Sequence, residues 1–397
     1  MLGAAPHRLM FFAGACAVLV SMLWWALLLG RLRFGWGFMP LPPSPMVPGW
    51  AHAMMTQYGM LPMFMFGFLL TVFPRWMGQP ALTTTRYVPV GIGILGGYLL
   101  VHAGLLGSKS LLAAGFMLML AGYVAGLVAL GGVLWRSRLQ DRWALSAWCA
   151  LALGAVGLAM FLAFILGADG RLGLFAVHLG TFAVLLPVYF TICHRMIPFF
   201  SSNVATNYQV RRPAWSLPVA WLLLLAHLFL AWFNSPFLWL ADLCLSAFFL
   251  WHWLAWQPWK CLRPGLLAAL YLAFAWLPLA FILYTIQDMM LVFQRQAVLG
   301  RAPLHALAIG FFGSMLVAMV TRVTMGHSGR PLQMGVVAWL CFALLQIVAL
   351  VRIGAAVSGD IYFWSAIAAF GWLLAFMPWI AHFLKIYLMP RADGRQG

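Results

Sequence analysis

The sequence predicts an all-α integral membrane protein, a polytopic bundle of about 12 transmembrane helices, from its hydrophobicity and its length. Of the 397 residues, 65% are hydrophobic and only 7% are charged. A helix of about 20 apolar residues crosses a hydrocarbon core of about 30 Å, so a chain of this length with short loops accommodates about a dozen spans. We expect one integral-membrane domain that comprises residues 1–397.

Windows of about 19 residues locate the apolar runs along the chain. The first run follows Arg8 and mimics a signal peptide, but it is too long for one and has no small-residue cleavage site before Arg31, so we expect a first span. The proline-rich segment 39–49 comes next and favours a polyproline-like strap. In order, the predicted spans are 11–30, 50–73, 87–106, 111–134, 143–166, 172–193, 217–232, 236–256, 266–286, 304–320, 334–351 and 362–384.

Basic residues lie in the turns between these runs and predict the orientation of the bundle. The two terminal segments and alternate loops carry 16 of the 23 Lys and Arg residues, and the other loops carry 7. Because cytoplasmic loops are enriched in Lys and Arg, both termini are predicted to be cytoplasmic. The net charge of +17 then faces lipid headgroups, and nucleic acid is not an expected partner.

Three histidines lie at a similar depth in the outer third of three different spans, His52 in the second, His178 in the sixth and His305 in the tenth. Ionisable side chains are costly inside a membrane, so they indicate function. Imidazoles on several helices at one depth are suited to holding haem iron axially or to binding copper. The alternative is that each is an interfacial residue of the aromatic belt, the role expected for His102 and His227.

All six acidic residues of the chain are Asp, and Asp242 is the only one predicted to lie within a span. It could neutralise a metal or carry a proton, or it could cap the start of the eighth span, and both interpretations stay open. The methionines of the second span, Met55 among them, could offer thioethers to Cu(I), although apolar packing is the favoured interpretation.

A second polar layer lies at the inner ends of the sixth and tenth spans. Arginine binds planar carboxylates or phosphates bidentately, which predicts a site for haem propionates or an anionic partner; turns that only contact lipid phosphates are the alternative. The 16 positions from His178 to His194 cover about 24 Å of helix, so the two layers cannot form one site. The cofactor contacts expected in the inner layer are His194, Arg195, Arg322, His327 and Arg330.

Several segments resemble the signature motifs of one family. Residues 305–307 (HAL) and 321–332 (TRVTMGHSGRPL) are similar to the long motif of the NnrS family, and 195–200 (RMIPFF), 68–71 (FLLT) and 74–76 (PRW) are similar to its other motifs. The resemblance covers essentially the whole chain. It implies a bacterial inner-membrane protein that contains haem and copper and is linked to the response to nitric oxide and to denitrification.

The second span departs from the family pattern. Where the family has HAHEM, this sequence has His52-Ala53-Met54-Met55, so methionine replaces the second His and the Glu. A metal centre that uses that second imidazole is altered here. Either copper is retained on thioether ligands, or the chain belongs to a branch with a modified activity.

The favoured function is a haem- and copper-binding membrane protein that binds or handles nitric oxide. His52 and His305 are the predicted haem ligands, and His178 is the predicted ligand of copper or of a second haem. Nitric oxide is small and apolar and reaches a buried iron through lipid, so no polar substrate path is required. A respiratory electron donor and membrane lipid are further expected partners, and catalytic turnover is not predicted.

Two other functions stay open, a secondary transporter or efflux protein and a metal-free sensor or assembly factor for a respiratory complex. Ion-coupled transporters generally use intramembrane carboxylates, of which this chain is predicted to have one. Only the haem-binding function predicts a Soret band in the optical spectrum of the purified protein.

Overall fold

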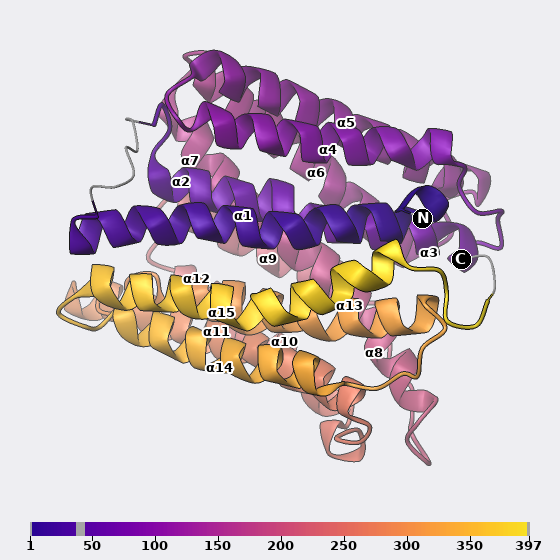
Figure 1. Cartoon of the computed structure of the whole chain (residues 1–397). Coiled ribbons are helices and arrows are strands. Elements are labelled where there is room, and N and C mark those ends of the chain that lie inside the picture. The colour runs from indigo at the N-terminus through magenta and orange to yellow at the C-terminus, as the bar shows by residue number, and fades with distance from the viewer. Residues whose placement is uncertain (1, 37–43, 395–397) are drawn as a thin grey trace.

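A computed structural model of the chain describes residues 2–36 and 44–394, which form helices joined by turns and, within these two ranges, no strands (Figure 1). The first five residues of the predicted polyproline strap, 39–43, lie outside the described residues. The α-helices are α1 (Pro6–Phe34), α2 (Pro48–Met54), α3 (Leu61–Trp76), α4 (Thr84–Gly104), α5 (Lys109–Arg136), α6 (Arg142–Ile165), α7 (Gly170–Leu179), α8 (Leu186–Ser202), α9 (Ser216–Trp232), α10 (Leu238–Ala255), α11 (Gly265–Gln294), α12 (Ala302–His305), α13 (Ser314–His327), α14 (Val336–Ala355) and α15 (Ile361–Leu388).

Three of the spans are composite helices. A π-helical segment joins α2 to α3, another joins α7 to α8, and a third joins α12 to α13, so each of these pairs crosses the bundle as one continuous rod. The π-helical segments are η2 (Met55–Met60), η3 (Gly180–Leu185) and η5 (Ala306–Gly313).

The predicted polytopic membrane bundle is confirmed. Among the described residues, 11 helices are long and apolar enough to cross a membrane, and α9 is a twelfth apolar helix of 17 residues. The predicted end of the ninth span, residue 286, is wrong, because α11 continues to Gln294. Asp288 therefore lies inside a helix and is buried, whereas the sequence assigned it to an external loop.

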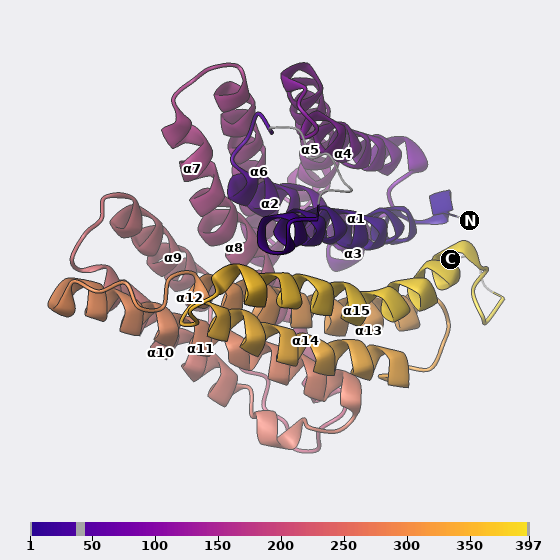
Figure 2. The ribbon, with the colours of Figure 1, turned by 60° about the vertical axis from the view of Figure 1, so that its left-hand side comes forward.

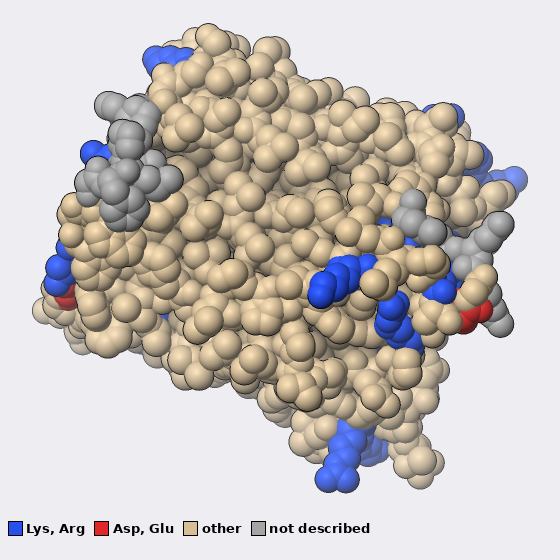
Figure 3. Space-filling model, viewed as in Figure 1, with Lys and Arg blue, Asp and Glu red and all other residues tan. Residues whose placement is uncertain are grey.

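Helix α1 runs through the middle of the molecule, where it packs against α3 and α15. Helices α4 to α7 lie on one side of it and α9 to α15 on the other (Figure 2). Both chain termini lie at the same end of the bundle, which we call the terminus end, and the other end is called the far end (Figure 1). On the face shown in Figure 3, charged side chains gather toward the ends of the helices and the broad middle carries hardly any, as expected for a surface that contacts lipid.

The terminus end is predicted to face the cytoplasm. A reporter enzyme that is active only in the periplasm is expected to give no signal when fused after residue 394, because the terminus end carries most of the Lys and Arg residues. The same reporter inserted after Gly167, in the turn between α6 and α7 at the far end, should be active. Activity at the C-terminus with none at Gly167 would reverse the orientation.

Glycines allow α4 and α5 to pack with their backbones in contact. A Cβ atom on Gly93 would lie 2.5 Å from the Cα atom of Gly122, and one on Gly97 would lie 2.5 Å from the carbonyl oxygen of Gly115. Small residues at helix interfaces are a common means of association in membranes, where lipid and apolar side chains are equally hydrophobic.

This packing predicts that Gly93→Ala destabilises the protein, because the new methyl group meets backbone atoms that cannot move independently. Overpacking of this kind costs about 1–3 kcal/mol. The matched control is Gly132→Ala on α5, where no atom in the described part of the chain lies within 4 Å of the added Cβ atom. Thermal unfolding in detergent should show a lower Tm for Gly93→Ala only; equal values for both variants would contradict the interpretation.

Candidate metal and cofactor site

Each of the three predicted outer histidines lies just before a π-helical segment. His52 precedes η2 by three residues, His178 precedes η3 by two, and His305 is directly followed by η5. A π-helical segment inserts an extra residue into the helical register and so redirects the side chains beside it; such segments are frequent at functional sites. The composite spans are therefore the helices on which a functional site is expected.

His52 and His305 line one cavity of about 110 Å³ in the far half of the bundle. Helices α1, α14 and α15 complete its wall with Trp25, Arg352 and Trp372. The structure thus brings together two of the three histidines that the sequence placed at one depth.

The hydrogen bond of His305 sets which ring nitrogen is free. Its Nδ1 atom lies 2.8 Å from the carbonyl oxygen of Arg301, one helical turn earlier. A carbonyl oxygen only accepts, so Nδ1 carries the proton and, in the neutral ring, Nε2 holds an unshared electron pair. Histidines that bind metals commonly show this arrangement, in which a backbone carbonyl orients the ring and selects the tautomer.

His52 is held against an indole ring and keeps one nitrogen unused. Its ring stacks on Trp25 with centroids 4.4 Å apart and an interplanar angle of 13°. Its Nδ1 atom is buried and has no hydrogen-bond partner among the residues that the structure describes. The stacking fixes the ring plane, so the imidazole is positioned before any ligand arrives.

Other polar atoms of the cavity also lack partners. Arg352 Nη1, Trp372 Nε1 and Gln57 Oε1 are buried without a hydrogen-bond partner in the described ranges, and all three residues line the cavity. Buried polar groups in proteins are nearly always paired, so four such atoms around one cavity, His52 Nδ1 included, indicate a missing ligand. Arg352 adds a positive charge, and no Asp is among the residues that line the wall.

Sequence reasoning missed Gln57, Arg352 and Trp372. Gln57 could have been found, because an amide in the middle of an apolar span is costly and indicates function. Arg352 was counted only as a loop cation. It lies inside α14, three residues before the helix ends at Ala355, and lines the cavity wall.

His178 is not among the residues that line this cavity. Its electrostatic neighbour is His227 on α9. The assignment of His227 to the aromatic belt is wrong, because its side chain is buried and its Nδ1 atom lies 2.5 Å from Asp242 Oδ1. Asp242 does not cap α10, whose N-terminus has no side-chain cap. The role of His178 as a metal ligand stays a prediction.

The residues present fit copper less well than haem. No group of three or more His, Cys, Asp or Glu side chains is placed to hold a metal ion in the described part of the chain. Met54 and Met55, which replace the ligands of the family pattern, are buried in the hydrophobic core and do not line the cavity. Haem iron, by contrast, needs only one or two imidazole ligands, and His52 and His305 line the same cavity from two different spans.

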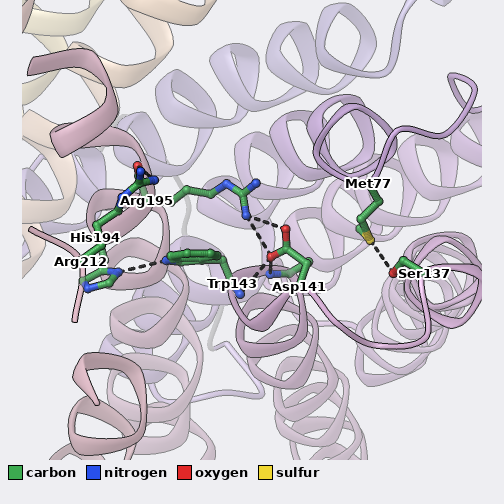
Figure 4. A network of polar contacts seen from close by, with 8 residues as sticks. Met77, Ser137, Asp141, Trp143, His194, Arg195 and Arg212 are labelled. Carbon is green, nitrogen blue, oxygen red and sulfur yellow. Dashed lines mark hydrogen bonds and ion pairs between the residues drawn. The ribbon is translucent and has the colours of Figure 1, made fainter. Parts of the chain in front are cut away.

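At the terminus end, the guanidinium of Arg195 binds an acid of the chain itself (Figure 4). Arg195 Nη1 donates to both carboxylate oxygens of Asp141, at 2.9 and 2.6 Å, and its guanidinium lies over the ring of Trp76. Trp143 Nε1 donates to His194 Nδ1 at 3.0 Å. Asp141 also caps α6, so this cluster joins helix ends, and cofactor contacts by His194 and Arg195 stay predictions.

Arg212 extends this cluster from the connection between α8 and α9. Burial and repulsion from Arg195 and Arg142 lower its pKa. Arg142 donates to the carbonyl oxygen of Arg212, and Arg212 donates to that of Arg195. These cations are therefore partly satisfied by backbone oxygens.

The residues of the tenth span divide between two places at the terminus end. Arg322 lies over the ring of Phe200 at 3.7 Å. His327 instead contacts His7 on α1, with ring centroids 4.5 Å apart. Arg330 Nη1 is buried without a partner in the described ranges. His7 was missed because it precedes the first apolar run, and anion binding by Arg322, His327 and Arg330 stays a prediction.

Comparison with known proteins gave one family match. The family model described as NnrS protein matches residues 1–391 of the chain. No curated protein matched the sequence.

Proposed function

The chain belongs to the NnrS family, membrane proteins of the nitric oxide response, and we propose that it binds haem in the cavity between His52 and His305. The observation that carries the proposal is the set of unused polar atoms on this cavity. His305 presents a free Nε2 electron pair, and His52 and Arg352 each have a buried nitrogen without a partner in the described residues.

Each of these residues has a defined role in the proposal. His52 and His305 hold the iron through their ring nitrogens. Arg352 donates to a haem propionate, since a guanidinium binds a planar carboxylate through two parallel hydrogen bonds. Trp25 keeps the His52 ring in place by stacking. Haem iron, when bound, would supply a centre at which nitric oxide binds in exchange for one of these two imidazoles.

The surroundings suit a small apolar gas. Leu61, Leu185, Ile309 and Phe312 contribute apolar side chains to the same cavity. An uncharged diatomic molecule dissolves in lipid and crosses such a lining without a hydrated path, whereas ions are excluded by the cost of burying charge. We propose the bacterial inner membrane as the location and a respiratory electron donor as a partner, and we assign copper no residues.

The optical spectrum of the purified protein tests the proposal. We expect a Soret band that shifts when nitric oxide is added, and one haem or more per chain by pyridine haemochrome assay. A transporter or a metal-free assembly factor predicts no such band. A protein produced with ample haem that shows neither band nor haem would reject the proposal.

A further inference from the structure

Three ionisable side chains from three successive helices meet in the far half of the bundle. They are His227 on α9, Asp242 on α10 and Asp288 on α11, and their exposed fractions are 2%, 0% and 8%. His227 Nδ1 lies 2.5 Å from Asp242 Oδ1. Because charge is costly in a membrane interior, a cluster of this kind requires an explanation beyond helix packing.

The carboxyl groups of Asp242 and Asp288 are close enough to influence each other electrostatically. Asp242 Oδ2 and Asp288 Oδ2 are both buried, and neither has a hydrogen-bond partner among the described side chains and backbone. Two neighbouring carboxylates repel each other when both are ionised. A proton held by one of them removes this repulsion and stabilises the pair. The ligand to which these unpartnered oxygens point is therefore a proton.

The surroundings provide no fixed positive charge to replace that proton. The titratable groups that face the cluster are His178 from α7 and Tyr284 from α11. Phe182, in η3, packs on His227 with ring centroids 3.9 Å apart. The ion pairs within the described ranges include no Lys or Arg bound to Asp242 or Asp288.

The net charge of the cluster depends on how many protons it holds. With one proton between the carboxyl groups and a neutral imidazole, the cluster carries a charge of −1. A second proton on the remaining carboxylate makes the cluster neutral overall, as two carboxylic acids and an imidazole. Surroundings of low dielectric constant favour a cluster whose net charge is zero, so uptake of the second proton is favourable without a metal ion or a partner.

We propose that His227, Asp242 and Asp288 form a proton-binding site that exchanges protons with water at the far end of the bundle. Asp288 lies six residues before the end of α11, about 9 Å of helix from the surface. In the exchange a proton moves between water and the cluster, and no electron is transferred. The site is separate from the haem proposal, although one helix connects them: Thr181 lines the cavity and Phe182, the next residue, contacts His227.

Infrared spectroscopy of the protein in lipid nanodiscs tests the proposal independently of haem. The chain has six Asp and no Glu, so few carboxyl groups contribute. At neutral pH we expect a C=O band of a protonated carboxylic acid that shifts within minutes of transfer to D2O. Asp242→Asn/Asp288→Asn should abolish this band, while Asp169→Asn, which removes an exposed carboxylate at the same end, should keep it.

A milder variant protects the test against misfolding. Asp288→Asn leaves an amide that can donate to an ionised Asp242, so the fold is retained, as checked by size-exclusion chromatography, and the band is lost. Absence of the band in the unsubstituted protein, or its persistence in the double variant, would overturn the proposal. A band that resists D2O for hours would overturn it as well, because it would show a structural hydrogen bond without proton exchange.

Discussion

His305→Ala is expected to lower the haem content of the purified protein by more than tenfold. The substitution removes the imidazole whose Nδ1 donates to the Arg301 carbonyl and whose Nε2 is free. Loss of a residue that merely orients a ligand typically costs about 10- to 100-fold in metal affinity, and loss of the ligand itself costs at least as much. The measurement is the ratio of Soret to protein absorbance, with total haem assayed after extraction.

The matched control is His102→Ala on α4. His102 also donates Nδ1 to a carbonyl oxygen one turn earlier, that of Tyr98, but it does not line the cavity. We expect its haem content and spectrum to be unchanged. If both variants keep their haem, His305 is not a ligand; if both lose it, the effect is general damage to the bundle.

Arg352→Gln is expected to weaken haem binding while leaving the haem-free protein as stable as before, or more stable. In the haem-free protein the guanidinium has a buried nitrogen without a partner in the described residues, and such a group destabilises the fold. With haem bound, the charge-assisted hydrogen bond to a propionate contributes about 1.5–3 kcal/mol. The loss corresponds to about a 10- to 140-fold weaker affinity, since 1.4 kcal/mol is a factor of ten.

Haem titration of the haem-free protein, with thermal unfolding in parallel, measures both effects. Arg352→Lys should have an intermediate affinity, because lysine keeps the charge but loses the planar fork. Arg171→Gln removes an exposed cation at the same end and serves as the control. Unchanged affinity in Arg352→Gln would exclude the propionate contact, and a lower Tm without haem would assign Arg352 a structural role.

The fold follows closely from local sequence. A membrane span needs only an apolar run of sufficient length, so the helices are largely recovered from hydropathy. The 11 long helices and α9 together make an even number of crossings, which explains why both termini lie at the same end of the bundle (Figure 1). The error at α11 has a physical cause. A hydropathy window loses its apolar signal at a charged residue, but Asp288 stays inside its helix and is buried near Asp242 on α10, 46 positions earlier in the sequence.

Methionine packing in the second span was also predictable. Met54 and Met55 lie in the hydrophobic core, the interpretation favoured for a chain with 23 methionines. Their burial follows from their apolar character and needs no knowledge of a partner helix. Whether a thioether faces a cavity depends on the partner helices. The structure places Met22 and Met60, rather than Met54 and Met55, on the cavity wall.

What the sequence by itself determined is the membrane bundle, its family motifs and the depth of each histidine, because hydropathy and helical rise are local properties. Depth does not specify the direction in which a side chain points around its helix. Only the tertiary structure decided that His52 and His305 share a cavity and that His178 lies outside it, because π-helical segments and helix packing set those directions. The proximity of Asp242 to Asp288 was likewise decided by helix packing, since two carboxyl groups far apart in sequence approach each other only when their helices bring them together.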